Sequence, residues 1–227
     1  MHEYPNGSTP SLHTAQGGRK YLNAGERRRF AKATLHAASD VRLFCLTLFF
    51  SGGRISEVLA LSPASIDLDS RVVTIRTLKR REPGVMRQVP LPRRLVRDLE
   101  RTFDIRRRQR DPDQSGRRLW PWSRTTGWRR VKEVMAVANV SLTAAMPKGL
   151  RHGFGVNATA NLVPQHLIQR WLGHASPKST AIYCDVCGPD ERGVAERMWK
   201  SGYPRSVYGM FGWTASLWRT LSSLWRC

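Results

Sequence analysis

Residues 52–61 read Gly-Gly-Arg-Ile-Ser-Glu-Val-Leu-Ala-Leu, and the interpretation of the whole chain starts from this stretch. The glycine pair follows a strongly apolar run at residues 41–50, and consecutive glycines favour a tight turn that ends a helix. A second, short helix is predicted to begin at Arg54, because apolar residues recur after it at the spacing of one helical face. The pattern predicts a buried helix, a sharp turn, and an arginine at the entrance to the next helix.

The rest of the chain is predicted to be mainly helical with one small sheet. Residues 71–77 are rich in β-branched side chains, residues 88–90 can pair back against them, and residues 79–86 would form the hairpin tip. Residues 105–118 are charged, contain Pro and Gly, and are expected to form a loop. Helices are predicted at about 23–36 (Asn23 and Glu26 as a capping box), 41–50 (capped by Asp40), 92–103, 124–140, 149–161, 164–172, 177–186 and 189–199. The predicted fold class is therefore α+β, predominantly α-helical.

The charge balance favours a nucleic-acid partner. The 227 residues include 38 Lys and Arg against 17 Asp and Glu, a formal net charge of +21. Such a surplus repels itself in a folded chain, and binding to phosphates relieves the repulsion while releasing counterions. Arginine is the commoner cation, which suits forked hydrogen bonding to phosphate. An anionic membrane surface, or a basic composition without any specific partner, are the alternatives.

The four cysteines are too few and too scattered for a disulfide framework. The pair Cys184 and Cys187 has no second pair and no histidine at zinc spacing, so no metal site is expected. No signal-peptide pattern and no long apolar run is found, which favours a reducing compartment, the cytoplasm. We expect a mobile polar lead-in at 1–20, a catalytic domain at 21–200 and a Trp-rich tail at 201–227.

Several further segments complete a pattern with residues 52–61. They are Thr77-Leu78-Lys79, Val89-Pro90-Leu91-Pro92, Gly149-Leu150-Arg151-His152-Gly153-Phe154, and Leu172-Gly173-His174 followed by Tyr183. In this order they resemble the motifs of the tyrosine recombinase (phage integrase) family over roughly residues 21–199. The resemblance implies a tyrosine recombinase/type IB topoisomerase-like catalytic domain with one small antiparallel sheet, acting on double-stranded DNA.

The residue types also suit the opening of a phosphodiester without a metal or other cofactor. That reaction needs a nucleophile, a proton donor for the leaving oxygen, and fixed cations around the charged intermediate. Arg54 and Arg151 stay charged and can each grip two phosphate oxygens. Tyr183 offers a nucleophilic oxygen, His174 can donate to a non-bridging oxygen, and Lys79 can act as general acid at the leaving 5′-oxygen. The resemblance implies a 3′-phosphotyrosine intermediate that a second strand's 5′-hydroxyl reverses.

One position departs from the family pattern. The second arginine motif usually reads His-x-x-Arg, whereas Lys148 stands three residues before Arg151 here. Lysine can still donate to a phosphate oxygen, and type IB topoisomerases use lysine there, so Lys148 joins the predicted site. His152 is expected to point off the helix in another direction and is given no role.

Each residue of the site also has a structural alternative. Arg54 could cap a helix and pair with Glu57, which we interpret as a buttress for that arginine. His174 could merely favour a helix dipole, Tyr183 could belong to the core, and Lys79 could be part of a solvated charge run. All these alternatives would have to hold at once for the predicted site to be wrong.

Many family members carry an N-terminal helical core-binding domain that completes a DNA clamp, and residues 1–20 are too few for one. We therefore expect a short form, of the kind found in the fimbrial phase-switch inverters, and the alternative is a truncated gene. The resemblance implies a homotetramer on paired DNA sites. The tail is expected to dock on a neighbouring protomer, and the alternatives are folding back on its own domain or an interfacial membrane helix.

The predicted function is site-specific DNA recombination of the integrase, resolvase or inverter type, within a mobile element. The alternatives are a type IB topoisomerase-like enzyme and a DNA-binding relative that has lost catalysis.

Overall fold

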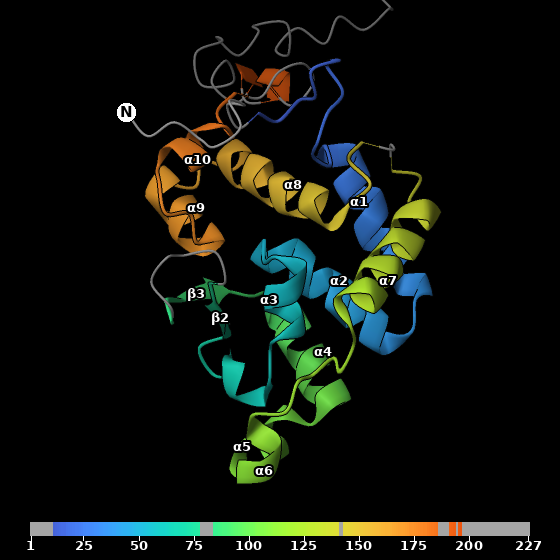
Figure 1. Cartoon of the computed structure of the whole chain (residues 1–227), viewed down its shortest axis with the longest axis vertical. Helices are drawn as coiled ribbons and strands as arrows, with labels where there is room; N and C mark the ends of the chain where they lie inside the picture. Colours follow the sequence, from blue (N-terminus) through green and yellow to red (C-terminus); the bar gives the residue numbers. More distant parts are fainter. Residues whose placement is uncertain (1–10, 78–83, 141–142, 186–190, 194, 197–227) are drawn as a thin grey trace, which may run out of the picture. The chain divides into compact units, whose positions relative to one another are not determined.

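The computed structural model describes residues 11–77, 84–140, 143–185, 191–193, 195 and 196. Over these residues the chain is mainly helical with one small antiparallel sheet, as predicted (Figure 1). The elements are α1 (Ala24–Ala33), η1 (Thr34–His36), α2 (Ser39–Ser51), α3 (Ile55–Leu59), η2 (Pro63–Ser65), β1 (Ile66–Asp67), β2 (Val72–Arg76), β3 (Met86–Pro90), α4 (Arg93–Phe103), α5 (Ile105–Arg110), α6 (Pro112–Ser115), α7 (Arg124–Val137), α8 (Pro147–Ala160), α9 (Gln165–Leu172) and α10 (Lys178–Ala181).

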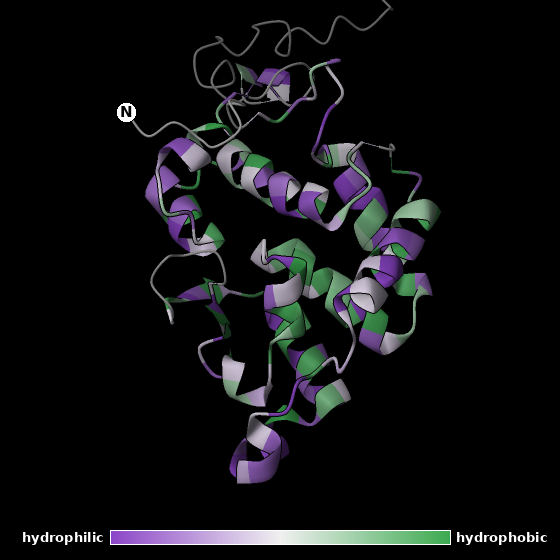
Figure 2. Cartoon of the chain, viewed as in Figure 1, coloured by the Kyte–Doolittle hydropathy of each residue, from purple (hydrophilic) through white to green (hydrophobic). Residues whose placement is uncertain are grey.

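Helix α2 forms the centre of the main core. It contacts α3, α4, α7 and α8, and its ribbon is largely hydrophobic in Figure 2, in contrast to the hydrophilic α5 and α6. Phe44 on α2 is fully buried and packs edge-on against Trp120 and Trp122, with ring centroids 5.4 Å apart in both pairs. Burying a side chain of this kind contributes about 1.5–3 kcal/mol, so the apolar run of α2 accounts for much of the core.

Helix α2 ends at Gly52, which takes the left-handed conformation with φ 61°. A Cβ at this position would lie within 3.0 Å of Phe154 on α8 and Leu172 on α9. Glycine is therefore required twice, for the backbone conformation and for the close approach of both helices. The turn predicted from the glycine pair is confirmed, and α3 begins directly after Arg54 as predicted.

The sheet has the strand order β1-β2-β3, with both pairs antiparallel. The predicted hairpin is confirmed, with Val73 opposite Val89 and Ile75 opposite Arg87. Its inner face is buried and includes Arg87, a charged residue at an apolar position of the alternation. Strand β1 was not predicted, because two residues are too short for a periodic signal. Residues 78–83, most of the predicted tip, lie outside the described residues.

Three predicted elements were wrong in their details. Residues 105–118 contain α5 and α6 rather than only a loop, because Ile105 is fully buried and Asp111 caps α6 ahead of Pro112. Asp40 lies inside the first turn of α2, whose N-cap is Ala38. The helix predicted at 177–186 is shorter, since α10 ends at Ala181 and a turn follows.

A second, smaller core cluster joins the start of the described chain to α8 and α9. It contains Leu12, Tyr21, Val156, Ala158, Ile168, Leu172, Ile182 and Tyr183. Residues 11–20, part of the predicted lead-in, form a turn with a bridge between His13 and Arg19, and Leu12 is buried in this cluster. The described helices include none that is long and apolar enough to cross a membrane. The predicted tail at 201–227 lies outside the described residues.

Candidate active site

Arg54 sits at the N-cap of α3, and Glu57 one turn later holds it there. The carboxylate of Glu57 accepts from the Arg54 backbone N–H at 2.9 Å and from Arg54 Nη1 at 2.7 Å. Burial alone would raise the pKa of Glu57, but hydrogen bonds and charge from Arg87 and then Arg54 outweigh it and lower that pKa to about 2. Glu57 is a buried carboxylate that stays ionised, so the predicted role as a buttress for Arg54 agrees with the geometry.

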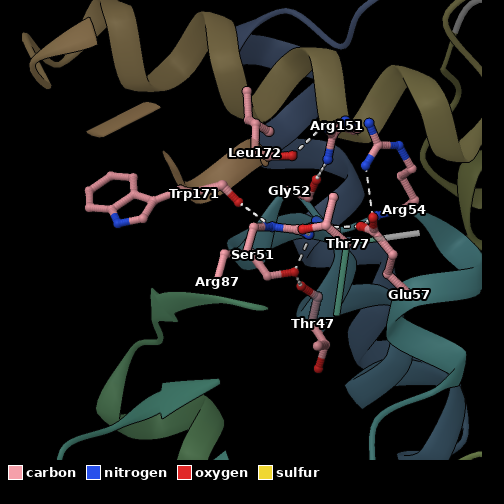
Figure 3. A network of polar contacts seen from close by, with 11 residues as sticks. Thr47, Ser51, Gly52, Arg54, Glu57, Thr77, Arg87, Arg151, Trp171 and Leu172 are labelled. Carbon is pink, nitrogen blue, oxygen red and sulfur yellow. Dashed lines mark hydrogen bonds and ion pairs between the residues drawn. The ribbon is translucent and has the colours of Figure 1, made fainter. Parts of the chain in front are cut away.

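Arg151, on α8, bridges two segments that are far apart in the sequence. Its guanidinium donates to the Gly52 carbonyl at 2.7 Å and to the Leu172 carbonyl at 2.6 Å (Figure 3). Burial, followed by the charge of Arg54, lowers the pKa of Arg151 to about 9, which leaves it cationic near neutral pH. One guanidinium thereby fixes the turn after α2 and the end of α9 around itself.

His174 follows the left-handed Gly173 that ends α9. Its Nδ1 lies 2.9 Å from Thr180 Oγ1, and its ring stacks on the Tyr183 ring at a centroid distance of 6.1 Å. Burial, with the charges of Arg151 and Arg54, lowers the pKa of His174 to about 3. The imidazole is therefore neutral near pH 7, with one ring nitrogen oriented by Thr180.

Tyr183 lies in the turn after α10 and is only 1% exposed. Its ring rests directly on α8 at Gly155, where an added Cβ would stand 2.5 Å from ring atoms. Its hydroxyl is 3.3 Å from His152 Nδ1. Burial raises the pKa of Tyr183 to about 12, although the charges of Arg151 and Arg54 oppose that rise. In this position the phenol is protonated and shielded from solvent.

The structure brings four of the six predicted site residues together: Arg54, Arg151, His174 and Tyr183. Lys148 is exposed on the first turn of α8, and its charge helps to lower the pKa of His152, which burial lowers first, to about 4. Lys79 lies outside the described residues. Among the described residues, no group of three His, Cys, Asp or Glu is arranged to hold a metal ion.

Sequence reasoning missed Arg87, Thr180 and the contact of His152 with Tyr183. Arg87 had a readable signal, because strand alternation places it on the same face of β3 as the apolar Val89. Thr180 and His152 had none, since their partners depend on how the turn after α10 packs against α8.

Comparison with known proteins identifies the family. The model of the phage integrase family matches residues 20–187, 168 of the 227 residues. The chain is 30% identical over 161 residues to the tyrosine recombinase XerA of Pyrococcus furiosus, covering 69% of this chain and 54% of that protein. It is 29% identical over 172 residues to the type 1 fimbriae regulatory protein FimE of Escherichia coli K12, covering 73% and 85%. The chain thus spans about half the length of the first relative.

A solved structure shares the fold. The crystal structure of the XerH site-specific recombinase bound to its difH substrate superposes with a TM-score of 0.63, at 18% identity, over 86% of this chain and 56% of that one. The family model matches well over half of the chain and contains all four converging residues. The chain belongs to the phage integrase family.

Proposed function

We propose that this chain is a site-specific DNA recombinase that cuts and rejoins double-stranded DNA through a covalent bond between Tyr183 and the 3′-phosphate. The observation that carries the proposal is the convergence of Arg54, Arg151, His174 and Tyr183 from four separate segments. Arg151 hydrogen-bonds the backbone on both sides of the site, and the charges of both arginines act on His174 and Tyr183.

The arginines supply the positive charge that the reaction needs. A phosphodiester attacked by an oxygen develops negative charge on its non-bridging oxygens, and preorganised cations stabilise that charge. Arg54 has about a quarter of its side chain exposed, so it can contact a phosphate, while the buried Arg151 provides a second positive charge from the protein interior. His174 is neutral before DNA binds, and a bound phosphate would partly offset the arginine charges and raise its pKa.

The proposed chemistry is an exchange of one phosphoester for another. The Tyr183 oxygen bonds to phosphorus, its proton passes to the neutral imidazole of His174, and the bond from phosphorus to the 5′-oxygen breaks. The leaving oxygen takes a proton from the lysine that the family pattern places at position 79, and Lys148 can donate to a non-bridging oxygen. Attack by the 5′-hydroxyl of another strand then reverses these steps. Each step exchanges one phosphoester bond for another, so no external energy source is needed.

The described conformation precedes this chemistry. Because Tyr183 is almost completely buried, its hydroxyl cannot contact a phosphate outside the protein, and the ring must leave its place against Gly155 first. We infer that DNA binding accompanies this movement.

The test uses a nicked DNA substrate whose short leaving fragment diffuses away, which traps the covalent adduct. Candidate duplexes come from DNA flanking the gene, with genomic fragments as a second pool. Native protein should form an adduct that survives denaturant, and Tyr183→Phe should form none. Binding without any adduct by folded native protein would contradict the enzyme and leave a DNA-binding relative.

A supercoiled plasmid separates recombination from a topoisomerase-like activity. Relaxation of a plasmid that lacks paired sites would favour the topoisomerase, whereas products that depend on two sites would support recombination. We also propose a homotetramer on paired sites in the bacterial cytoplasm, with the tail at 201–227 docking on a neighbouring protomer. Cross-linking of the full chain with and without DNA tests the tetramer.

A further inference from the structure

Arg87 is the most highly connected buried cation of the site, and the predicted chemistry leaves it unused. It lies on β3 and is 5% exposed. It donates through Nε to the Trp171 carbonyl at 2.8 Å, through Nη1 to Thr77 Oγ1 at 2.9 Å, and through Nη2 to Glu57 Oε2 at 2.6 Å (Figure 3). One side chain thus joins α9, the end of β2 and α3.

The first consequence concerns charge. Glu57 divides its carboxylate between Arg54 at one oxygen and Arg87 at the other. Two cations therefore share one anion, and the trio carries a net positive charge. Without Arg87, more of the Glu57 charge would act on Arg54 and hold it more tightly, since a buried pair attracts strongly at low dielectric. Arg54 would then offer less charge to a phosphate.

The second consequence concerns His174. Trp171 and Leu172 present consecutive carbonyls at the end of α9, and Arg87 takes the first while Arg151 takes the second. Gly173 comes next and lies directly on Arg87, since an added Cβ would meet Arg87 atoms at 3.1 Å. Arg87 therefore fixes the backbone that leads into His174.

We propose that Arg87 is a positioning residue for DNA cleavage, which keeps a net positive charge available at Arg54 and sets the position of His174 through the end of α9. This inference rests on the proposed function. Arg87 reaches no solvent-facing surface, so it acts through Arg54 and His174 and not on the phosphate itself. A merely structural arginine would tie the hairpin to the core without any influence on the charge felt by the substrate.

The experiment compares two trapping duplexes that differ only at the scissile position: an ordinary phosphate, or a methylphosphonate, in which one charged oxygen is replaced by a neutral methyl group. Single-turnover cleavage is measured for native protein, Arg87→Met, Arg87→Lys and the double variant Glu57→Gln/Arg87→Met. Arg97→Met, an exposed arginine on α4, serves as the matched control. Circular dichroism and thermal melting verify that each variant is folded.

Arg87→Met should slow cleavage of the phosphate about 100-fold, the lower end of the range for loss of a preorganised charge-stabilising group, and cleavage of the methylphosphonate by only about 3-fold. The double variant should recover at least 10-fold on the phosphate, because it removes the Glu57 charge that would otherwise hold Arg54. Arg87→Lys keeps the charge but cannot make three divergent contacts, so its loss should be similar on both substrates and report on His174 alone.

Equal losses on both substrates, with no recovery in the double variant, would overturn the proposal, as would native rates in Arg87→Met. If Arg87→Met does not fold, the double variant and Arg87→Lys still discriminate between the two roles. Adduct formation by native protein and its absence in Tyr183→Phe test the proposed function separately. A second readout needs no cleavage. The affinity of each duplex is measured for Tyr183→Phe and for the double variant Tyr183→Phe/Arg87→Met. This double variant should bind the phosphate duplex more weakly than Tyr183→Phe does, and the methylphosphonate duplex equally well.

Discussion

Gly155→Ala is the perturbation that tests most directly whether Tyr183 is held back from the reaction. Gly155 lies in the middle of α8, and its added Cβ would stand 2.5 Å from Cε1 and Cζ of Tyr183 and 2.6 Å from Cε2. Carbon atoms in contact normally lie about 3.5–4.0 Å apart. The helix backbone is fixed by its own hydrogen bonds, so the ring must move outward by about 1 Å or leave the pocket.

Steric overlap sets the magnitude. Forcing an extra methyl group into a packed site costs about 1–3 kcal/mol. The gain in helix propensity from Gly to Ala, up to about 1 kcal/mol, is the same whether Tyr183 is buried or released, because α8 is a helix in both states. Every 1.4 kcal/mol changes an equilibrium tenfold, so the population with Tyr183 released should rise by a factor between about 5 and about 140.

The assay has one structural and one functional readout. Nitration of Tyr183, followed by mass spectrometry, should be faster in Gly155→Ala, and the pKa of the phenol should fall from about 12 towards its ordinary value of 10. The rate of adduct formation should rise by the same factor, between about 5 and about 140. Gly116→Ala is the control, because no atom lies within 4 Å of its added Cβ. Unchanged nitration and titration in folded Gly155→Ala protein would refute the reasoning.

Three other changes have defined outcomes. The pKa values of His152 and His174 are lowered to about 4 and about 3 from 6.5. As the pH is lowered, the unfolded chain therefore binds protons before the folded chain does. The free energy of unfolding should fall as the pH decreases from 6.5 to about 4. For two partly solvated rings we expect the free energy of unfolding to fall by about 1–1.5 kcal/mol per pH unit, half of the fully buried limit. In urea denaturation, His152→Gln and His174→Gln should each show a weaker dependence of this free energy on pH. Gly52→Ala should cost about 2–5 kcal/mol in thermal unfolding, from left-handed strain and overlap. Arg151→Lys should leave the Leu172 carbonyl unpaired and slow adduct formation at least 100-fold, while filter binding shows DNA affinity within about 3-fold of the native value.

The elements that the sequence predicted well are those whose signals are local. The apolar run before Gly52, the capping box of Asn23 with Glu26, and the β-branched residues of β2 each carry their information within a few residues. The failures at residues 105–118 have the opposite cause. Helix α5 forms because Ile105 finds a buried place, and neither charge content nor Pro and Gly content reveals that.

The site residues also divide into those with a local sequence signal and those whose contacts depend on tertiary packing. Arg54, Arg151, His174 and Tyr183 were identified by motif and order, and the structure brings them together. The motifs could not predict that Tyr183 is buried. Its contact with Gly155 joins residues 28 positions apart in the sequence, and it depends on how the turn after α10 packs on α8. Arg87 was recognisable only as an arginine on the inner face of a strand, and its three partners come from three other elements.

In the proposed mechanism, the cationic part of the site is assembled before DNA binds, whereas Tyr183 is not yet in place. Arg151 and Arg87 are fixed by five hydrogen bonds to the surrounding chain, and such preorganised charges need no rearrangement during the reaction. Tyr183 is buried and protonated, so the proposed chemistry requires its release first on any DNA sequence. If binding energy from the correct site drives that release, selectivity resides in the movement of Tyr183 and less in the contacts of the arginines. Loosening the pocket should then speed cleavage of a poor site more than that of the preferred site. Equal acceleration of both by Gly155→Ala would show instead that site selection occurs before the tyrosine moves.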